Sequence, residues 1–334
     1  MRQSRLTLAL DSGAVSLPDE GRIAVFGPAA DADLSALPAE RVQIVQGFKP
    51  DHDAWAARGY EVRVAPEGGF AAAVLFVPRA KDKARALLAE AVALVTGGPV
   101  IVDGAKTDGI DSLLKDCRKR AEVAAPLSKA HGKIFALKAD PAAFADWAGA
   151  PKTLPDGFRT RPGVFSADAV DRGSALLADA LPAKLKGRVA DLGAGWGYLA
   201  VRALAAHPGI TELHLVEADF DALACARENV TDPRARFHWA DATRFDPGTP
   251  FDAVITNPPF HTGRAADPAL GQAFLSNAAR ILGRSGALYA VANRHLPYER
   301  ILGELFLEVD EIGGDPGFKV IRAARPKAPS RGRR

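Results

Sequence analysis

The feature that most constrains this chain is a regular alternation of short apolar runs with helix-like stretches in its second half. Helix-like segments such as GYLAVRALAAH and DALACARENV separate the first five runs. This alternation predicts a parallel, doubly wound sheet with helices on both faces. The last two runs lack a clear helix between them, so we expect an antiparallel hairpin at one edge. The seven candidate strands are RVADLGAG, LHLVEAD, ARFHWAD, FDAVITNPP, GALYAVAN, LEVDEIGG and FKVIRAA.

Residues 20–140 repeat this order. The helical segment KDKARALLAEAVALV precedes the fifth apolar run, and GIDSLLKDC follows it. Because α/β alternation is common, chance likeness between two ordinary domains is the alternative. We interpret the repeat as a duplication, which predicts an α/β fold with two tandem Rossmann-like domains, each a mainly parallel seven-stranded sheet with an antiparallel edge hairpin. The seven runs are RIAVFGP, VQIVQGF, YEVRVAP, FAAAVLFVP, GPVIVDGA, AEVAAPLS and KIFALKA.

A length of 334 residues also fits two domains. The stretch DPAAFADWAGAPKTLPDG (140–157) is rich in Pro, Gly and Ala, which is typical of a linker. We therefore expect a first domain at 1–145, a second at 155–326, and a flexible basic tail at 327–334.

The charge is concentrated at the end of the chain. The net charge is +3, and residues 319–334 contain seven Lys or Arg and no acid, so the remainder carries −4. The last stretch, RPKAPSRGRR, lacks apolar periodicity and is expected to be attracted to polyanions. The alternative is a tail that only promotes solubility.

Several classes of protein are disfavoured by composition. No apolar stretch reaches the roughly 18 residues of a membrane span, and the opening MRQSRLTLALDSG meets an acid too early for a secretory signal. A cytoplasmic protein without a membrane partner is expected. The two cysteines, Cys117 and Cys225, are isolated in helix-like stretches. They predict reduced, buried thiols and neither a disulfide framework nor a metal site.

A glycine-rich turn follows the first strand of the second half. Asp191, Gly193, Gly195 and Gly197 form the pattern D-x-G-x-G-x-G. Glycine lets a backbone pass close to a ligand at a helix start, and dinucleotide-binding proteins share this feature. A carboxylate at Asp191 would repel phosphates, however, and suits the cationic amino-acid end of S-adenosylmethionine.

Two further carboxylates are expected at the same sheet edge. Glu217 ends the second strand, twenty residues after Gly197, a separation at which a carboxylate commonly meets ribose hydroxyls. Asp219 is a near rival for that role. Asp241 follows the third strand and could accept a hydrogen bond from the adenine amine, or be an ordinary solvated loop acid.

The more specific motif is Asn257-Pro258-Pro259-Phe260, which follows the fourth strand. The prolines fix the backbone and leave the Asn257 amide oxygen and the Pro258 carbonyl as acceptors in fixed positions. Together they could hold a planar NH2 group. Phe260 offers a face on which a base can stack. A rigid turn with a core Phe is the structural alternative.

These motifs together resemble class I methyltransferases that act on planar exocyclic or amide nitrogens. Three groups share them: adenine-N6 DNA enzymes, glutamine-N5 enzymes and guanine-N2 enzymes of ribosomal RNA. The stretches PGVFSADAVDRGSALL (162–177), NPPFHTG (257–263), VANRHLPY (291–298) and PGFKVIRA (316–323) resemble the last group, of the RsmC type. The resemblance covers residues 160–325 by specific motifs and the first half by pattern alone.

The resemblance implies an enzyme that uses S-adenosylmethionine to methylate the N2 of a guanine in ribosomal RNA, with small-subunit 16S rRNA as the expected substrate. It implies catalytic roles for Asn257, Pro258, Pro259 and Phe260. Phe260, His261 and Lys319 would contact the nucleotide, and Phe165 and Ser166 would cover the site. The implied cofactor-binding residues are Asp191, Gly193, Gly195, Gly197, Glu217, Asp241, Phe165 and Asn257.

The first half keeps the pattern but not the chemistry. It has FGPAADA where the second half has DLGAGWG, and LFVPRAK in place of ITNPPFH. We therefore expect an inactive copy without a cofactor site, as the RsmC-type resemblance also implies. The expected partner is ribosomal RNA or a ribosomal subunit, and the expected state is a monomer. Alternatives are a 23S rRNA guanine-N2 enzyme, or a non-catalytic rRNA-binding assembly factor.

Overall fold

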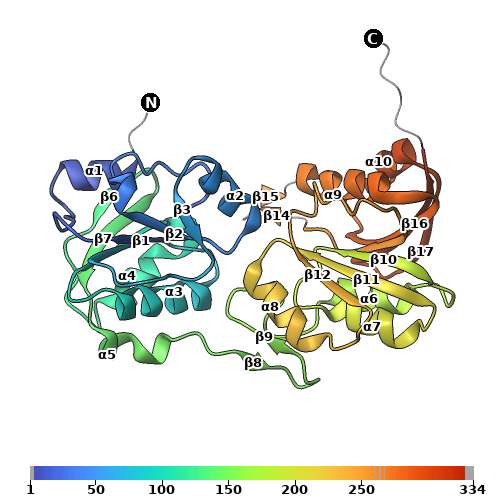
Figure 1. Cartoon of the computed structure of the whole chain (residues 1–334), viewed down its shortest axis with the longest axis horizontal. Coiled ribbons are helices and arrows are strands. Elements are labelled where there is room, and N and C mark those ends of the chain that lie inside the picture. Colours follow the sequence, from blue (N-terminus) through green and yellow to red (C-terminus); the bar gives the residue numbers. More distant parts are fainter. Residues whose placement is uncertain (1–3, 260, 263–264, 267, 328–334) are drawn as a thin grey trace, which may run out of the picture. The chain divides into compact units, whose positions relative to one another are not determined.

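The structure of the protein is a computed structural model that describes residues 4–259, 261–262, 265–266 and 268–327 (Figure 1). The chain divides into two compact units. The first unit comprises Met1–Pro151 with Arg161–Gly163, and the second comprises Lys152–Thr160 with Val164–Arg334. Each unit is built around its own seven-stranded sheet. Among the described residues, no helix is long and apolar enough to cross a membrane.

The first unit has the strand order β3-β2-β1-β4-β5-β7-β6. Strands β1 to β5 run parallel, and β7 and β6 are antiparallel at one edge. Its strands are β1 (Ile23–Phe26), β2 (Val42–Val45), β3 (Glu61–Arg63), β4 (Ala72–Phe76), β5 (Pro99–Ala105), β6 (Leu127–Lys129) and β7 (Gly132–Lys138). Its α-helices are α1 (Arg5–Asp11), α2 (Lys49–Ala57), α3 (Lys81–Leu94), α4 (Ile110–Cys117) and α5 (Pro141–Phe144).

The second unit has the corresponding order, β12-β11-β10-β13-β16-β18-β17. Its sheet strands are β10 (Gly187–Leu192), β11 (Ile210–Glu217), β12 (Ala235–Trp239), β13 (Phe251–Thr256), β16 (Leu282–Asn293), β17 (Phe306–Gly314) and β18 (Phe318–Pro326). Its α-helices are α6 (Arg172–Ala180), α7 (Tyr198–Ala206), α8 (Phe220–Asn229), α9 (Pro268–Ile281) and α10 (Tyr298–Leu305). Two short hairpins complete it, namely β8 (Lys152–Thr153) with β9 (Arg159–Thr160), and β14 (His261–Thr262) with β15 (Ala265–Ala266).

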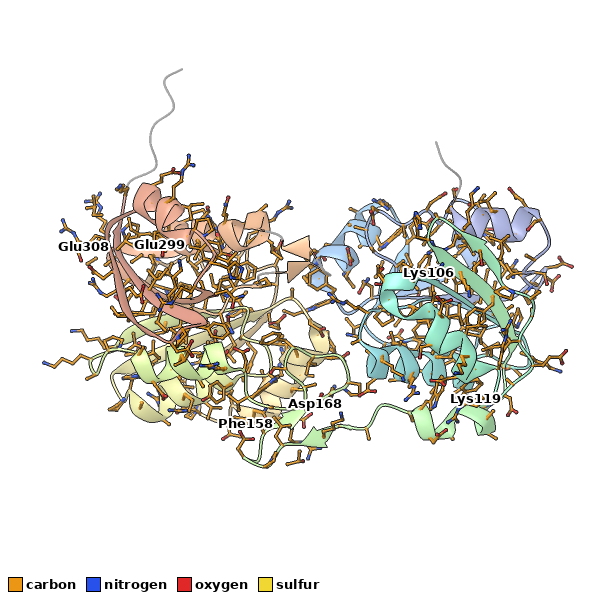
Figure 2. All side chains as sticks on the ribbon, turned by 180° about the vertical axis from the view of Figure 1, so that it is seen from behind. Lys106, Lys119, Phe158, Asp168, Glu299 and Glu308 are labelled. Carbon is orange, nitrogen blue, oxygen red and sulfur yellow. The ribbon has the colours of Figure 1, made fainter. Side chains whose placement is uncertain are left out.

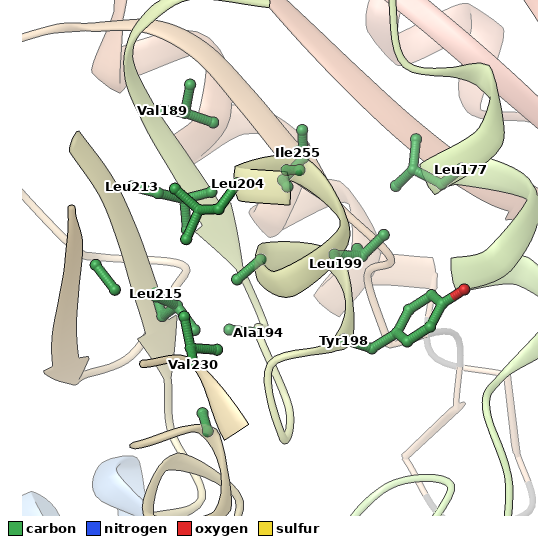
Figure 3. Close-up of a cluster of buried hydrophobic side chains, with 14 of the residues drawn as sticks. Leu177, Val189, Ala194, Tyr198, Leu199, Leu204, Leu213, Leu215, Val230 and Ile255 are labelled. Carbon is green, nitrogen blue, oxygen red and sulfur yellow. The ribbon is translucent and has the colours of Figure 1, made fainter. Parts of the chain in front are cut away.

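Alternate residues of each central strand face opposite sides of the sheet and pack into different cores. Val189 of β10 joins a cluster with Leu199 of α7 and Leu177 of α6 (Figure 3). The next residue, Ala190, joins a cluster on the opposite face with Leu275 of α9 and Leu302 of α10. Helices therefore cover both faces of the sheet, and the expected fold of two tandem Rossmann-like domains is confirmed.

The structure differs from or adds to the sequence expectations at three places. The linker stretch begins with α5, and Trp147, two residues beyond the expected end of the first domain, is buried in the first unit's core. The run at 121–128 forms a strand only from Leu127. Helix α10 lies between β16 and β17, where no helix was expected. The predicted hairpin of the last two strands is confirmed, with β17 and β18 antiparallel at the sheet edge.

Candidate active site

A pocket in the second unit brings together segments that lie far apart in the sequence. It is formed by the glycine-rich turn after β10, the first turn of α6, the segment before α6, and the end of β13. The lining residues are Phe165, Ser166, Asp171, Ser174, Gly193, Ala194, Gly195, Trp196, Tyr198, Leu199 and Asn257. Two separately predicted motifs, the glycine turn and Asn257, thus share one pocket.

The glycine turn requires glycine for steric reasons. Gly193 has φ of 73°, and a Cβ atom there would lie 3.1 Å from the Phe274 ring. Gly197, directly before α7, has φ of 91°, and a Cβ atom there would lie 2.7 Å from Val230. Side chains other than hydrogen are disfavoured at such positive φ angles. The turn therefore leaves its backbone open to a ligand at the start of a helix.

Glu217 fastens this turn to the neighbouring loop. One carboxylate oxygen accepts a hydrogen bond from the Gly195 N–H at 2.8 Å, and the other accepts from the Asp219 N–H at 2.7 Å. Burial raises the pKa of Glu217. The rival carboxylate, Asp219, caps α8 by accepting from the Asp221 and Ala222 N–H groups. Glu217 is therefore the acid that contacts the glycine turn, as a ribose-binding carboxylate there should.

Asp191 is a fully buried carboxylate with an unusual environment. It is 0% exposed, and neither of its oxygens has a hydrogen-bond partner among the described residues. Burial, and to a smaller extent the neighbouring charge of Glu217, raise the pKa of Asp191 to about 8. An unpartnered buried carboxylate is costly unless a cation or donor meets it. The residues present therefore fit a cationic ligand, as the ammonium and sulfonium of S-adenosylmethionine would provide.

Asp241 lies in the turn after β12. Its Oδ1 accepts from the backbone N–H and the hydroxyl of Thr243, at 2.8 and 2.6 Å. The next residue, Ala242, is held by Asn277 of α9, whose side-chain amide donates to the Ala242 carbonyl at 2.7 Å. The turn is thus anchored, and Asp241 remains partly exposed.

Asn257 stands directly after β13 and is held by α6. Its Nδ2 donates to Oδ2 of Asp171 at 2.8 Å and to the hydroxyl of Ser174 at 2.9 Å. Pro258 is buried and Pro259 partly buried, consistent with a stiff turn. Phe260 and the side chain of His261 lie outside the described residues, so their predicted contacts stay predictions.

Phe165 and Ser166 form one wall of the pocket. The Phe165 ring is 63% exposed, while its carbonyl accepts from the Trp196 indole N–H at 3.0 Å. Ser166 has φ of 53°, and its hydroxyl donates to the Ala169 carbonyl at 2.7 Å. An exposed aromatic ring on a fastened backbone is a surface on which a planar ligand can stack. Phe158 and Asp168, labelled in Figure 2, also belong to the segment that precedes α6.

Lys319 does not line the pocket. It is buried, and its ammonium donates to the Leu296 carbonyl at 2.7 Å and to Glu299 of α10 at 2.5 Å. Figure 2 shows Glu299 on the α10 side of this unit, away from Phe158 and Asp168. The expected nucleotide contact of Lys319 finds no support in this arrangement, because the charge is already neutralised inside the unit.

Sequence reasoning missed six lining residues, namely Asp171, Ser174, Ala194, Trp196, Tyr198 and Leu199. Asp171 and Ser174 lie in the stretch 162–177 on which the resemblance rests. An acid before an apolar helical run is a recognisable helix N-cap. That signal predicts a helix start, but it does not reveal that the cap also meets Asn257.

Sheet register identifies the matching positions in the first unit. Phe26 pairs with Val45 before Gly27, as Leu192 pairs with Val216 before Gly193. The Gly27 N–H donates to the Val45 carbonyl, and the Gly193 N–H donates to the Val216 carbonyl, both at 2.9 Å.

From this register, Val25 corresponds to Asp191 and Gln46 corresponds to Glu217. Phe76, one residue beyond the partner of Phe26, corresponds to Asn257. Asp191, Glu217 and Asn257 are thus each replaced by a different residue in the first unit.

The replacements fill the first unit's turn with its own side chains. The Gln46 amide donates to the Pro28 carbonyl at 2.9 Å, and the Trp55 indole donates to the same oxygen at 3.1 Å. The Gln46 oxygen accepts from the Phe48 N–H at 2.9 Å. Polar groups that could meet a ligand are therefore satisfied internally.

The two cysteines are buried as predicted, Cys117 in α4 and Cys225 in α8, and neither forms a disulfide within the described part of the chain. Within the described ranges, no group of three or more His, Cys, Asp or Glu side chains is arranged to hold a metal ion.

Comparisons with known proteins agree with this geometry. The family model of the methyltransferase small domain matches residues 156–322. Ribosomal RNA small subunit methyltransferase C of Shewanella loihica is 32% identical over 265 residues, covering 75% of this chain and 76% of that protein. The protein of the same name from Idiomarina loihiensis is 29% identical over 325 residues, covering 91% and 93%.

A solved structure is similar across both units. The 16S rRNA N2 G1207 methyltransferase (RsmC) of T. thermophilus, in complex with AdoMet and guanosine, matches with a TM-score of 0.76 and 25% identity. The match covers 93% of this chain and 90% of that one. By the family model and by the identity and coverage of its relatives, this chain belongs to the ribosomal RNA small subunit methyltransferase C family.

Proposed function

We propose that this protein transfers the methyl group of S-adenosylmethionine to the exocyclic N2 of a guanine in 16S ribosomal RNA. The observation that carries the proposal is the single pocket that contains both the glycine turn and Asn257. The glycine turn on one side of that pocket directly follows the buried Asp191, whose carboxyl group suits a cationic cofactor, and Asn257 offers an amide for recognition of an amine. The T. thermophilus relative, solved with AdoMet and guanosine, supports the same pair of ligands.

S-adenosylmethionine supplies an electrophilic methyl group on a sulfonium. The chain would hold this cofactor through Asp191, the backbone of Gly193 and Gly195, Glu217 and Asp241. Glu217 already orients the turn through the Gly195 N–H, so little rearrangement is required on binding. Phe165 would cover the ligand, since its exposed ring lines the same pocket.

Asn257 and Pro258 act on the substrate amine. The Asn257 oxygen and the Pro258 carbonyl accept the two N2 hydrogens, which orients the nitrogen lone pair and withdraws it from conjugation with the ring. Positioning and hydrogen bonding of this kind supply most of the catalysis in such a transfer. A strong base is not required, because the nitrogen becomes acidic once it is methylated and its proton then passes to water.

The target guanine must be unpaired or flipped out of its stack, because N2 in a helix cannot enter a pocket. Flipping costs a few kcal/mol. The proposed reaction places the protein in the cytoplasm, with ribosomal RNA or a ribosomal subunit as its partner. A monomer suffices, since the pocket is lined by residues of one unit of one chain.

The first unit is proposed to be an inactive copy. Val25, Gln46 and Phe76 stand where the second unit has Asp191, Glu217 and Asn257. An apolar side chain and a neutral amide do not attract a cation, and Phe76 cannot accept hydrogen bonds from an amine. The first unit would therefore serve structure or RNA binding, and chemistry would take place only in the second.

The test is methylation of ribosomal RNA and 30S subunits from cells that lack the enzyme, with mass-spectrometric mapping of the product. The proposal predicts N2-methylguanine in 16S rRNA. Asn257→Ala should reduce kcat by about 100-fold or more, while the affinity for S-adenosylmethionine and Tm stay near wild type. Methylation of 23S rRNA, of adenine or of a glutamine side chain would overturn the substrate, and an unchanged kcat would overturn the role of Asn257.

A further inference from the structure

Asn257 is held by two acceptors that come from one helix end. Its amide nitrogen donates to Oδ2 of Asp171 at 2.8 Å and to Oγ of Ser174 at 2.9 Å. A side-chain amide has two hydrogens to donate and one oxygen that accepts. Because both hydrogens are used within the protein, the group that Asn257 offers to a ligand is the oxygen.

The two acceptors are themselves fixed. Asp171 is the N-cap of α6, and its Oδ2 also accepts from the Ser174 N–H at 2.8 Å. Ser174 is 8% exposed, in the first turn of α6. This helix packs against α7, β16 and β17. The Asn257 amide is thus oriented by a rigid element and not by a mobile loop.

The Oδ2 oxygen of Asp171, which also accepts from the Ser174 N–H, decides which way the Asn257 amide faces. An ionised carboxylate only accepts hydrogen bonds, whereas a hydroxyl such as Ser174 can either donate or accept. Rotating the Asn257 amide by 180° would place its oxygen against the Asp171 carboxylate and lose the hydrogen bond to Asp171. Ser174 alone would tolerate either orientation, so the discrimination depends on Asp171.

We propose that Asp171, assisted by Ser174, is a positioning residue that locks the Asn257 amide with its oxygen available to the substrate. The inference rests on the proposed function, in which that oxygen accepts from the substrate amine. The inference also makes the proposed function more specific, because the fixed oxygen of Asn257 selects substrates that present an NH2 group. A base edge that presents a carbonyl at this point meets a second acceptor and is rejected.

The experiment is a double-mutant cycle in the full-length protein, read out as single-turnover methyl transfer at saturating cofactor and RNA. Asp171→Ala should lower the rate about 10- to 100-fold in the wild-type background, as expected for loss of a hydrogen bond to a charged group. In the Asn257→Ala background the same change should alter the rate less than about threefold, because nothing is left to orient. Equal factors in both backgrounds would overturn the proposal.

Two variants separate positioning from loss of the helix cap. Asp171→Asn keeps an N-cap of comparable strength and an acceptor oxygen, so it should restore most of the rate. Asp179→Ala is the matched control, since it removes a carboxylate from the same helix that pairs with Arg202 and does not line the pocket. It should leave the rate unchanged. If Asp171→Asn were as slow as Asp171→Ala, with cofactor affinity also lost, the role would be structural.

NMR of the Asn side chains tests the orientation independently of catalysis. The signal that Asn257→Ala removes should show slow hydrogen exchange in the wild type and faster exchange in Asp171→Ala. An exchange rate that does not change would overturn the lock. If exchange accelerates but Asn257→Ala keeps full activity, the lock stands and the proposed role of Asn257 in methyl transfer fails.

Discussion

In the first unit, β1 passes through Val25 before it reaches its glycine turn, whereas in the second unit β10 passes through Asp191. The strand orders of the two sheets correspond, and each sheet ends at one edge in an antiparallel pair. The differences lie where the strands end. A fold of this kind is therefore maintained by the apolar faces of its strands, while a few residues at the carboxyl edge decide whether it binds anything.

The largest effect is expected when one of these residues in the second unit is replaced by its counterpart from the first unit. Asp191→Val gives the second unit the residue of the first, and it should weaken S-adenosylmethionine binding by more than about 100-fold, because a buried charge pair is lost. Without cofactor, the variant should unfold at a higher temperature than the wild type, since a buried unpartnered carboxylate is gone. Calorimetry and thermal unfolding at pH 8 measure both effects.

The number of cofactor sites per chain, measured in the same calorimetric titration, also tests whether the two units differ. Wild-type protein should bind one S-adenosylmethionine per chain, and Asp191→Val should leave no comparable site. Two sites in the wild type, or one remaining in the variant, would show that the first unit binds the cofactor after all.

The pKa of Asp191 makes a prediction for stability against pH. An acid whose pKa is raised by folding takes up more protons in the folded state, so its penalty is absent below about pH 4 and grows until about pH 8. Asp191→Asn should therefore stabilise the cofactor-free protein little at pH 5 and by a few kcal/mol at pH 8. The free energy of unfolding of both proteins is measured with denaturant at the two pH values. The contributions of other groups cancel in the difference between the two proteins. A difference that is constant with pH would contradict the raised pKa.

In the first unit, Gln46→Ala should affect stability and not chemistry. It removes a donor from the Pro28 carbonyl and an acceptor from the Phe48 N–H. A loss of about 1 to 3 kcal/mol is expected, with cofactor affinity and kcat near wild type. The matched change Glu217→Ala should weaken cofactor binding. If Gln46→Ala lowered cofactor affinity as much, the two units would not differ in function as proposed.

The smallest effect concerns the end of the chain. The Lys327 N–H donates to the Leu305 carbonyl at 2.8 Å, so Lys327, which was expected to belong to the tail, is hydrogen-bonded to the second unit. Residues 328–334 lie outside the described residues, and their role stays a sequence-based prediction. Truncation after Lys327 removes Arg331, Arg333 and Arg334. The slope of log affinity for RNA against log salt should flatten by about 2, at roughly 0.7 per phosphate contact, while saturating turnover stays unchanged.

An unchanged salt slope would leave the tail with a role in solubility alone. A collapse of the saturating rate would place the tail within the active complex.

The sequence allowed prediction of the strands, because alternation and apolar runs depend on local pattern. It also allowed Asp191, Glu217 and Asn257 to be placed at the carboxyl ends of parallel strands, where the structure has them. Long-range contacts were not predictable. Lys319 was expected to face a nucleotide, but its partner Glu299 lies on α10, a helix the pattern did not reveal. The contact of Asp171 with Asn257 joins residues 86 positions apart, and no periodicity carries that information.

The unpartnered carboxylate of Asp191 has a consequence for the abundance of the protein. A ligand that binds only the folded state stabilises it in proportion to the logarithm of its concentration. A chain with a buried carboxyl group that lacks a partner gains more from a ligand that pairs with this group than a chain without it. Proteases act on the fraction that unfolds, and a change of 1 to 2 kcal/mol alters steady-state levels about several-fold. Cells that run short of S-adenosylmethionine would therefore hold less of this protein, and its supply of cofactor would set its lifetime as well as its turnover.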